Sequence, residues 1–185
     1  MGGGLSATPL YCKKLNIMES VLENKLMTLY KDEMISYLKM HPNYFDEAVQ
    51  LAISDKQPYS WRAAFLLWGS IEENDNRIKK YVKTIISCIP EKKDGHQREL
   101  LKILYKMKIN ANHEGQIYNI CINLWGQKNK TPSVRMTAFK YIVRIVKLHP
   151  ELMDEIVFLT QDHYLESLSP GVKSSIKRMM QELIQ

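Results

Sequence analysis

The sequence lacks most of the features that mark membrane, secreted or metal-binding proteins. No apolar run reaches the roughly 18–20 residues that a membrane-spanning helix needs. Only three cysteines occur, Cys12, Cys88 and Cys121, and their wide spacing and odd number disfavour both a disulfide framework and a zinc site. No apolar stretch typical of secretory signals follows the basic pair Lys13-Lys14. These absences favour a cytoplasmic protein whose thiols are reduced.

Sequence patterns for catalysis and for cofactor binding are missing as well. There is no glycine-rich phosphate loop and no nucleophile elbow, and Cys121 has no identifiable base partner. The five histidines show no i, i+4 pairing and no carboxylate at metal-ligand spacing. We therefore expect no cofactor, no metal and no small-molecule substrate, and we favour a function other than catalysis.

Regular alternation of apolar and polar residues, which would predict strands, is absent. Residues 18–40 contain neither Pro nor Gly, and Leu22 and Leu26 begin a pattern of helical spacing there. This stretch predicts one long helix or two helices that meet without a clear breaker. Residues 1–17 lack periodic apolar residues, so we expect them to be poorly ordered. We expect residues 18–185 to form a single domain.

The residues that mark helix boundaries in the second half of the chain recur in its first half. Thr131 suits an N-cap, Pro132 suits the first helical position, and Pro150 follows the end of the same helix. The segment around His41-Pro42 recurs 108 residues later around His149-Pro150, a separation of three units of 36. A fixed period of this kind is the signature of a helical repeat array.

The period and the breakers predict four helix pairs. The predicted pairs are 42–54 with 60–73, 76–89 with 95–108, 114–126 with 132–148, and 150–160 with 170–184. Units of about 37 residues with Pro at helix entries resemble HEAT repeats of the armadillo-type superfamily. Trp61-Arg62-Ala63-Ala64 and the segment Ser133 to Ala138 carry this resemblance most closely. It implies an all-α, right-handed α-α superhelix, a HEAT-like solenoid of about four helix pairs plus an N-terminal helix.

Two sets of residues that could contact nucleic acid are interpreted as structural. Arg62, Arg98, Arg135 and Lys173 follow one another at separations of 36, 37 and 38. Because Arg135 shares a helix face with Phe139, its guanidinium is expected to extend out of the core and pair with a turn carboxylate such as Asp55. Trp61 and Trp68, seven residues apart, are interpreted as part of the core between helices rather than as a base-stacking platform.

The net charge of +6 is unevenly distributed. Residues 1–75 carry seven Lys/Arg and ten Asp/Glu, whereas residues 76–185 carry nineteen and ten. Parallel stacking of the second helices would bring cations of the second half into one stripe on the concave face. The predicted anion-binding residues are Lys102, Lys106, Lys140, Arg144, Lys147, Lys173 and Lys177. The alternative is a solvated polar face without a ligand.

Three functions fit these patterns. The first is a non-enzymatic scaffold that binds a macromolecular partner, with a protein favoured over nucleic acid, through its concave, basic C-terminal half. The second is a DNA-binding or DNA-repair protein, because a branch of HEAT-like proteins comprises DNA glycosylases for alkylated bases, with a basic groove, tryptophans and a catalytic aspartate. The matching aspartate cannot be placed in this sequence. The third is a purely structural subunit of a larger assembly.

Overall fold

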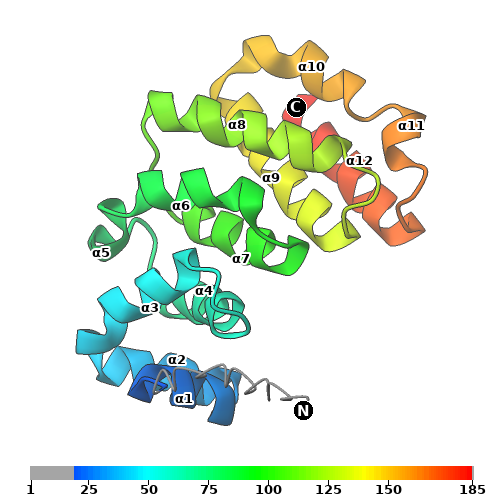
Figure 1. Ribbon diagram of the computed structural model, residues 1–185. Helices are drawn as coiled ribbons and strands as arrows, with labels where there is room; N and C mark the ends of the chain where they lie inside the picture. The colour runs from blue at the N-terminus through cyan, green and yellow to red at the C-terminus, as the bar shows by residue number, and fades with distance from the viewer. Residues whose placement is uncertain (1–18, 185) are drawn as a thin grey trace, which may run out of the picture.

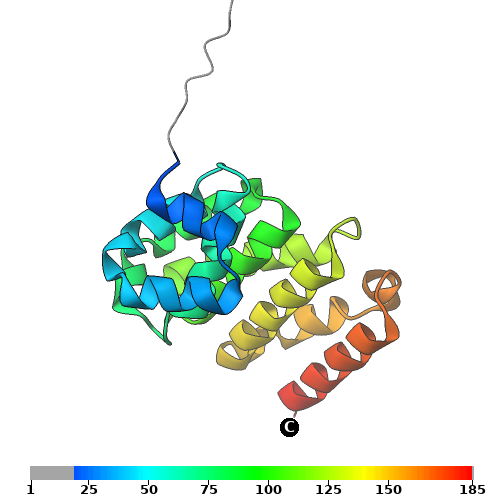
Figure 2. The same ribbon diagram turned by 90° about the horizontal axis from the view of Figure 1, so that it is seen from below.

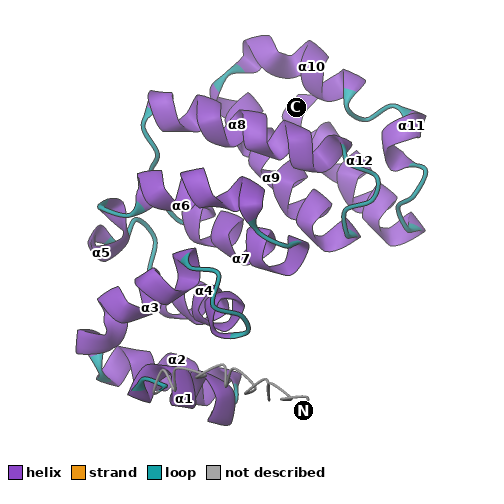
Figure 3. Cartoon of the chain, in the orientation of Figure 1, coloured by secondary structure: helices purple, strands orange, loops and turns teal. Residues whose placement is uncertain are grey.

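The computed structural model describes residues 19–184, and within that range the only regular elements are helices (Figures 1 and 3). The α-helices are α1 (Val21–Thr28), α2 (Lys31–Met40), α3 (Phe45–Ile53), α4 (Tyr59–Ser70), α5 (Asn76–Lys79), α6 (Val82–Cys88), α7 (Asp94–Tyr105), α8 (Ala111–Gly126), α9 (Pro132–Leu148), α10 (Met153–Phe158), α11 (Asp162–Leu165) and α12 (Pro170–Ile184). Short 3-10 helices span Pro42–Tyr44, Ile89–Glu91 and Pro150–Leu152. The predicted all-α fold is confirmed, whereas the segment 1–17 lies outside the described residues.

The helices stack as successive pairs and form a solenoid (Figures 1 and 2). One layer contains α2, α4, α7, α9 and α12, each packed against the next. The other layer contains α3, α6 and α8, each of which packs against the next helix of its layer. In the last repeat, α10 and α12 both pack on α9 and the short helix α11 connects them. The second helices therefore form one continuous layer, as predicted.

The chain begins with two helices rather than one. The break falls at Leu29, whose backbone is extended, and the Glu33 side chain accepts a hydrogen bond from the backbone N–H of Tyr30. At the start of α1 the cap is reciprocal, because Glu23 accepts from the backbone N–H of Ser20 and Ser20 Oγ accepts from that of Glu23. Such a capping box satisfies N–H groups that have no partner within the helix. The break therefore arises because two helix starts lie only ten residues apart, at Ser20 and Tyr30, and it needs no proline or glycine.

The two His-Pro corners have the same backbone conformation. His41 has φ −125° and ψ 68°, and His149 has φ −131° and ψ 74°; each is followed by a 3-10 helix and then an α-helix. The repeat predicted from the sequence is confirmed at this level. The two imidazole rings differ in their contacts. His41 donates to the carbonyl of Tyr37, whereas His149 lies beside the carboxylates of Glu114 and Glu151.

Two predicted first helices are shorter than expected. The stretch 76–89 divides into α5 and α6, and Lys80 and Tyr81 at the break both bind the Asp46 carboxylate of α3. The stretch 150–160 begins with a 3-10 turn, so α10 covers only Met153–Phe158. Residues 162–165, which lie between the two predicted helices of the last pair, form α11.

Candidate functional site

The buried residues of the second helices show how the repeats align. Ala63 of α4, Leu100 of α7 and Ala138 of α9 are fully buried, as are Leu67, Leu104 and Ile142. Both sets are separated by 37 and then 38 residues, so a position on α4 corresponds to one 37 residues later on α7. The same offset of 38 matches Ala138 with Ile176, the fully buried residue of α12.

In this alignment the basic series of Arg62, Arg98, Arg135 and Lys173 does not form one column. The position of Arg135 is taken by Gln97 on α7 and by Ser60 on α4, and Arg98 corresponds to Trp61. Each residue along a helix is rotated by about 100° from the one before it. A shift of one or two residues therefore turns Arg62 and Arg98 to other sides of their helices, and only Arg135 and Lys173 correspond.

Arg135 is a structural residue, but its predicted carboxylate partner is wrong. The side chain is buried and donates to the carbonyls of Trp125 (3.0 Å) and Tyr164 (2.5 Å) and to Oγ of Ser167 (2.8 Å). Gln97 makes the corresponding contact, because its Nε2 donates to the carbonyl of Ile89 at 3.0 Å. Arg135 and Gln97 thus bind backbone carbonyls where the first helix of their repeat ends.

Two of the predicted anion-binding residues, Lys106 and Arg144, occupy corresponding positions and make corresponding contacts. Lys106 Nζ donates to the carbonyls of Trp68 (2.9 Å) and Ile71 (2.8 Å) at the C-terminus of α4. Arg144 donates to the carbonyls of Tyr105 and Met107 at the end of α7. A cation at a helix C-terminus interacts favourably with the helix dipole. Both side chains therefore join one repeat to the next.

The other predicted residues fall into separate groups. Lys102 and Lys140 occupy corresponding positions and line one pocket together with Lys106. Lys173 and Lys177 line a second pocket of about 410 Å³ beside Thr160 and Leu165. Lys140, Lys147, Lys173 and Lys177 are exposed, and within the described part of the chain their ammonium groups make no hydrogen bond or ion pair. The position of Lys140 continues in α12 as Arg178 rather than Lys177.

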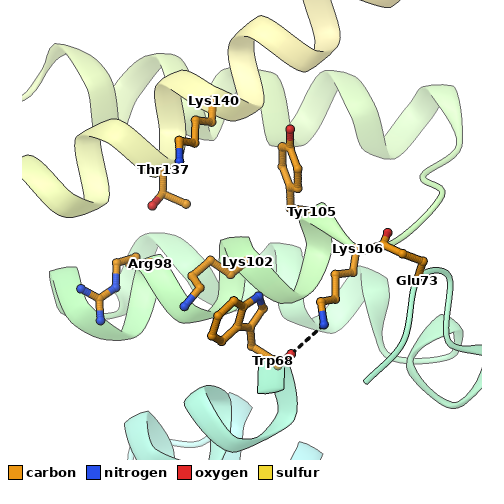
Figure 4. A pocket seen from close by; sticks show the side chains of 8 residues that line it. All are labelled: Trp68, Glu73, Arg98, Lys102, Tyr105, Lys106, Thr137 and Lys140. Carbon is orange, nitrogen blue, oxygen red and sulfur yellow. Dashed lines mark hydrogen bonds between the residues drawn. The ribbon is translucent and has the colours of Figure 1, made fainter. Parts of the chain in front are cut away.

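The pocket between α4, α7 and α9 combines aromatic and basic side chains (Figure 4). Its volume is about 500 Å³, and its lining is Trp68, Glu73, Arg98, Lys102, Tyr105, Lys106, Thr137 and Lys140. Lys102 Nζ lies 3.2 Å from the centroid of the Trp68 ring, a close cation–π contact. Trp125, by contrast, is fully buried and packs against Phe139 in the core.

A buried carboxylate holds two of the cations of this pocket. The side chain of Glu99 is 0% exposed, and it forms ion pairs with Arg98 (2.6 Å) and Lys102 (2.8 Å). Burial lowers the pKa of Lys102 because it disfavours the charged amine, and the hydrogen bond to Glu99 partly opposes this effect. Sequence reasoning did not identify Glu99, although an acid three residues before Lys102 on a helix is a signal for such a pair.

The described residues offer little support for catalysis or metal binding. Among residues 19–184 there is no group of three or more His, Cys, Asp or Glu side chains that could hold a metal ion. Burial raises the pKa of the Cys88 and Cys121 thiols, which disfavours the reactive thiolate. None of the helices in the described range combines the length and the apolar character that a bilayer span requires.

Comparison with known proteins identifies one family. The model of a HEAT repeat domain matches residues 18–183. No match was found among curated proteins or among solved structures. The match covers nearly the whole chain and agrees with the stacked helix pairs and the corresponding caps of successive repeats. The chain therefore belongs to the HEAT repeat domain family.

Proposed function

We propose that this chain is a non-enzymatic scaffold that binds a macromolecular partner through its concave, basic C-terminal half. The observation that supports this function is the set of four exposed lysines, Lys140, Lys147, Lys173 and Lys177, on adjacent parallel helices. Lysines that make no internal contact are available to an external anion. Lys173 and Lys177 line the second pocket, beside Thr160 and Leu165, so the basic surface of α12 lies on another side of its helix from the position of Lys140.

The test is a comparison of two sets of charge reversals that change the net charge equally. The first set replaces Lys140, Lys147, Lys173 and Lys177 by Glu. The control replaces Lys39, Lys79, Lys83 and Lys108, which are also exposed but lie outside α9 and α12. Lys106 and Arg144 are left intact because their reversal would break the contacts between repeats.

Retention on an immobilised polyanion at about 0.1 M salt is the measurement. We expect the first set of reversals to abolish retention and the control set to reduce it only slightly, because contacts between opposite charges are local and screened beyond about 10 Å at 0.1 M salt. The proposal fails if the parent protein binds no polyanion, or if both sets lose retention equally.

The alternative, a DNA-repair enzyme, predicts a different result. Release of an alkylated base from duplex DNA by the parent protein would assign that function and replace the scaffold proposal. Duplex binding alone, with a steep dependence on salt, would indicate phosphate contacts without catalysis.

A further inference from the structure

The pocket between α4, α7 and α9 contains a pair of cations that a buried group holds in place. Oε1 of Glu99 accepts hydrogen bonds from Arg98, and Oε2 accepts one from Lys102. A guanidinium has five N–H donors and an ammonium has three. Each cation therefore keeps donors that Glu99 does not use, while the carboxylate fixes where they lie. Preorganised donors of this kind bind an anion without first having to become ordered.

A third cation faces this pair from the next repeat. Lys140 lies on α9 and lines the same pocket as Arg98 and Lys102 of α7 (Figure 4). The four basic residues of the lining outnumber Glu73 at its edge and Glu99 beneath it by two charges. The pocket thus attracts an anion, and an anion bound there would bridge two repeats.

The aromatic side chains of the pocket are already engaged by the chain itself. Lys102 lies over the ring of Trp68, and the Phe65 ring lies 6.4 Å from it. Arg144 lies over the ring of Tyr105 at 4.9 Å, and Tyr141 meets that ring edge to face. Proteins that bind single-stranded nucleic acid stack bases on open aromatic faces. This pocket does not offer that platform.

The pocket also presents acceptors beside its donors. Glu73 is a carboxylate at its edge, and Thr137 donates its hydroxyl proton to the carbonyl of Ser133, which leaves Oγ1 free to accept. A phosphodiester backbone has no donors for such groups, whereas a peptide carries one N–H on each residue except proline. The mixture of donors and acceptors favours a peptide as the ligand.

We propose that this pocket binds an acidic segment of a protein partner. Arg98, Lys102 and Lys140 contact its carboxylates, and Glu99 acts as the positioning residue. A volume of about 500 Å³ lies in the range of ligand pockets and accommodates a few side chains of such a segment. This inference rests on the proposed function, since it specifies the partner class and the place where that partner binds.

The probe is a blocked hexaglutamate peptide, titrated at low salt into the full chain and compared with short single-stranded and duplex oligonucleotides. Lys140→Gln removes an exposed cation and leaves the fold intact, and Lys83→Gln on α6 is the matched control. We expect the first variant to weaken peptide binding about tenfold, the value of one charge-assisted hydrogen bond, and the control to change it less than twofold. Glu99→Gln should also weaken binding, provided that its circular dichroism matches the parent.

A second readout locates the peptide. The indole N–H resonance of Trp68, assigned by its absence in Trp68→Phe, should shift on peptide addition because Lys102 lies on that ring. The inference is overturned if the peptide binds without moving this resonance and Lys140→Gln binds it as the parent does. The proposed scaffold function would then remain, and only this pocket would be excluded as the place where the peptide binds. Tighter binding of an oligonucleotide, with the same shift, would replace the acidic segment by nucleic acid. If no polyanion binds, the proposed function fails as well.

Discussion

The cations of the second helices divide into two kinds according to what their nitrogens bind. Arg135, Lys106 and Arg144 donate to backbone carbonyls at the ends of neighbouring helices. Lys140 and Lys177 donate to nothing in the described part of the chain. The first kind stabilises the fold and the second is available to a ligand, although both look alike in the sequence.

Arg135→Ala should destabilise the protein by about 2–3 kcal/mol. The substitution leaves the carbonyls of Trp125 and Tyr164 without their donor and opens a cavity beside the Trp125 ring. Urea denaturation measures the effect. Arg178→Ala, at an exposed position of α12, is the control and should change the free energy of unfolding by less than about 0.5 kcal/mol. Equal effects of the two variants would contradict the structural role of Arg135.

His96 makes the protein sensitive to mild acid. The ring is buried, its Nε2 donates to the carbonyl of Ala52 at 2.6 Å, and its Nδ1 accepts from Gln57. Burial lowers the pKa of His96, while the nearby Lys92 and Asp55 act on it in opposite directions. The folded protein thus holds a neutral ring when the unfolded chain, with a histidine pKa near 6.5, already binds a proton.

The free energy of unfolding should therefore decrease as the pH falls below about 6.5. Because the pKa is lowered in the folded state, the stability is complete above 6.5 and is lost towards the lower pKa of His96. His96→Asn should flatten this dependence between pH 7 and roughly 5, measured by urea denaturation at a series of pH values. His163→Asn, at an exposed position, should leave the slope as in the parent. An unchanged slope in the His96 variant would contradict the argument.

At the scale of the helix, the characteristic contact of this fold is a cation that caps the preceding second helix. Lys106→Met keeps most of the apolar stem and removes the two hydrogen bonds to α4. We expect a loss of about 1 kcal/mol, the usual effect of a charge at a helix terminus. Thermal or urea denaturation tests this, with the exposed Lys108→Met as control. A Lys106 variant as stable as its control would show that the cap contributes nothing.

The helices could be predicted from sequence where local chemistry decides them. Pro132, Pro150 and the His-Pro corners fix helix ends through the backbone of a few residues, and these ends were predicted well. The break at Leu29 depends on a second helix start at Tyr30, where Glu33 binds the backbone N–H, and the spacing of apolar residues does not reveal it. The division of 76–89 depends on Asp46, which is distant in the sequence.

The candidate site was predicted less well because the alignment of repeats depends on burial. Counting from Arg62 to Arg98 gives 36, whereas the core positions of α4 and α7 are 37 apart. Lys102 and Lys140 were predicted from their spacing. Trp68 enters the pocket only when α4 and α7 pack together, which requires the fold.

At the scale of the whole molecule, the repeats differ in how firmly they are held. The buried residues of α7 and α9 are many, whereas Ile176 is the one buried residue among those described in α12. Regions with few buried contacts open at low free energy. Hydrogen exchange should therefore be faster in the amides of α12 than in those of α7 and α9. Equal protection of the three helices would contradict this expectation.

The position of Lys106 and Arg144 is occupied in α12 by Glu182, which cannot donate to the end of α9. Two contacts between successive second helices thus include a cation at this position, and the contact between α9 and α12 does not. If the ends of the solenoid were pulled apart, the force would act on these contacts between second helices one after another. The array would yield first between α9 and α12, so that it would extend stepwise from its C-terminal repeat.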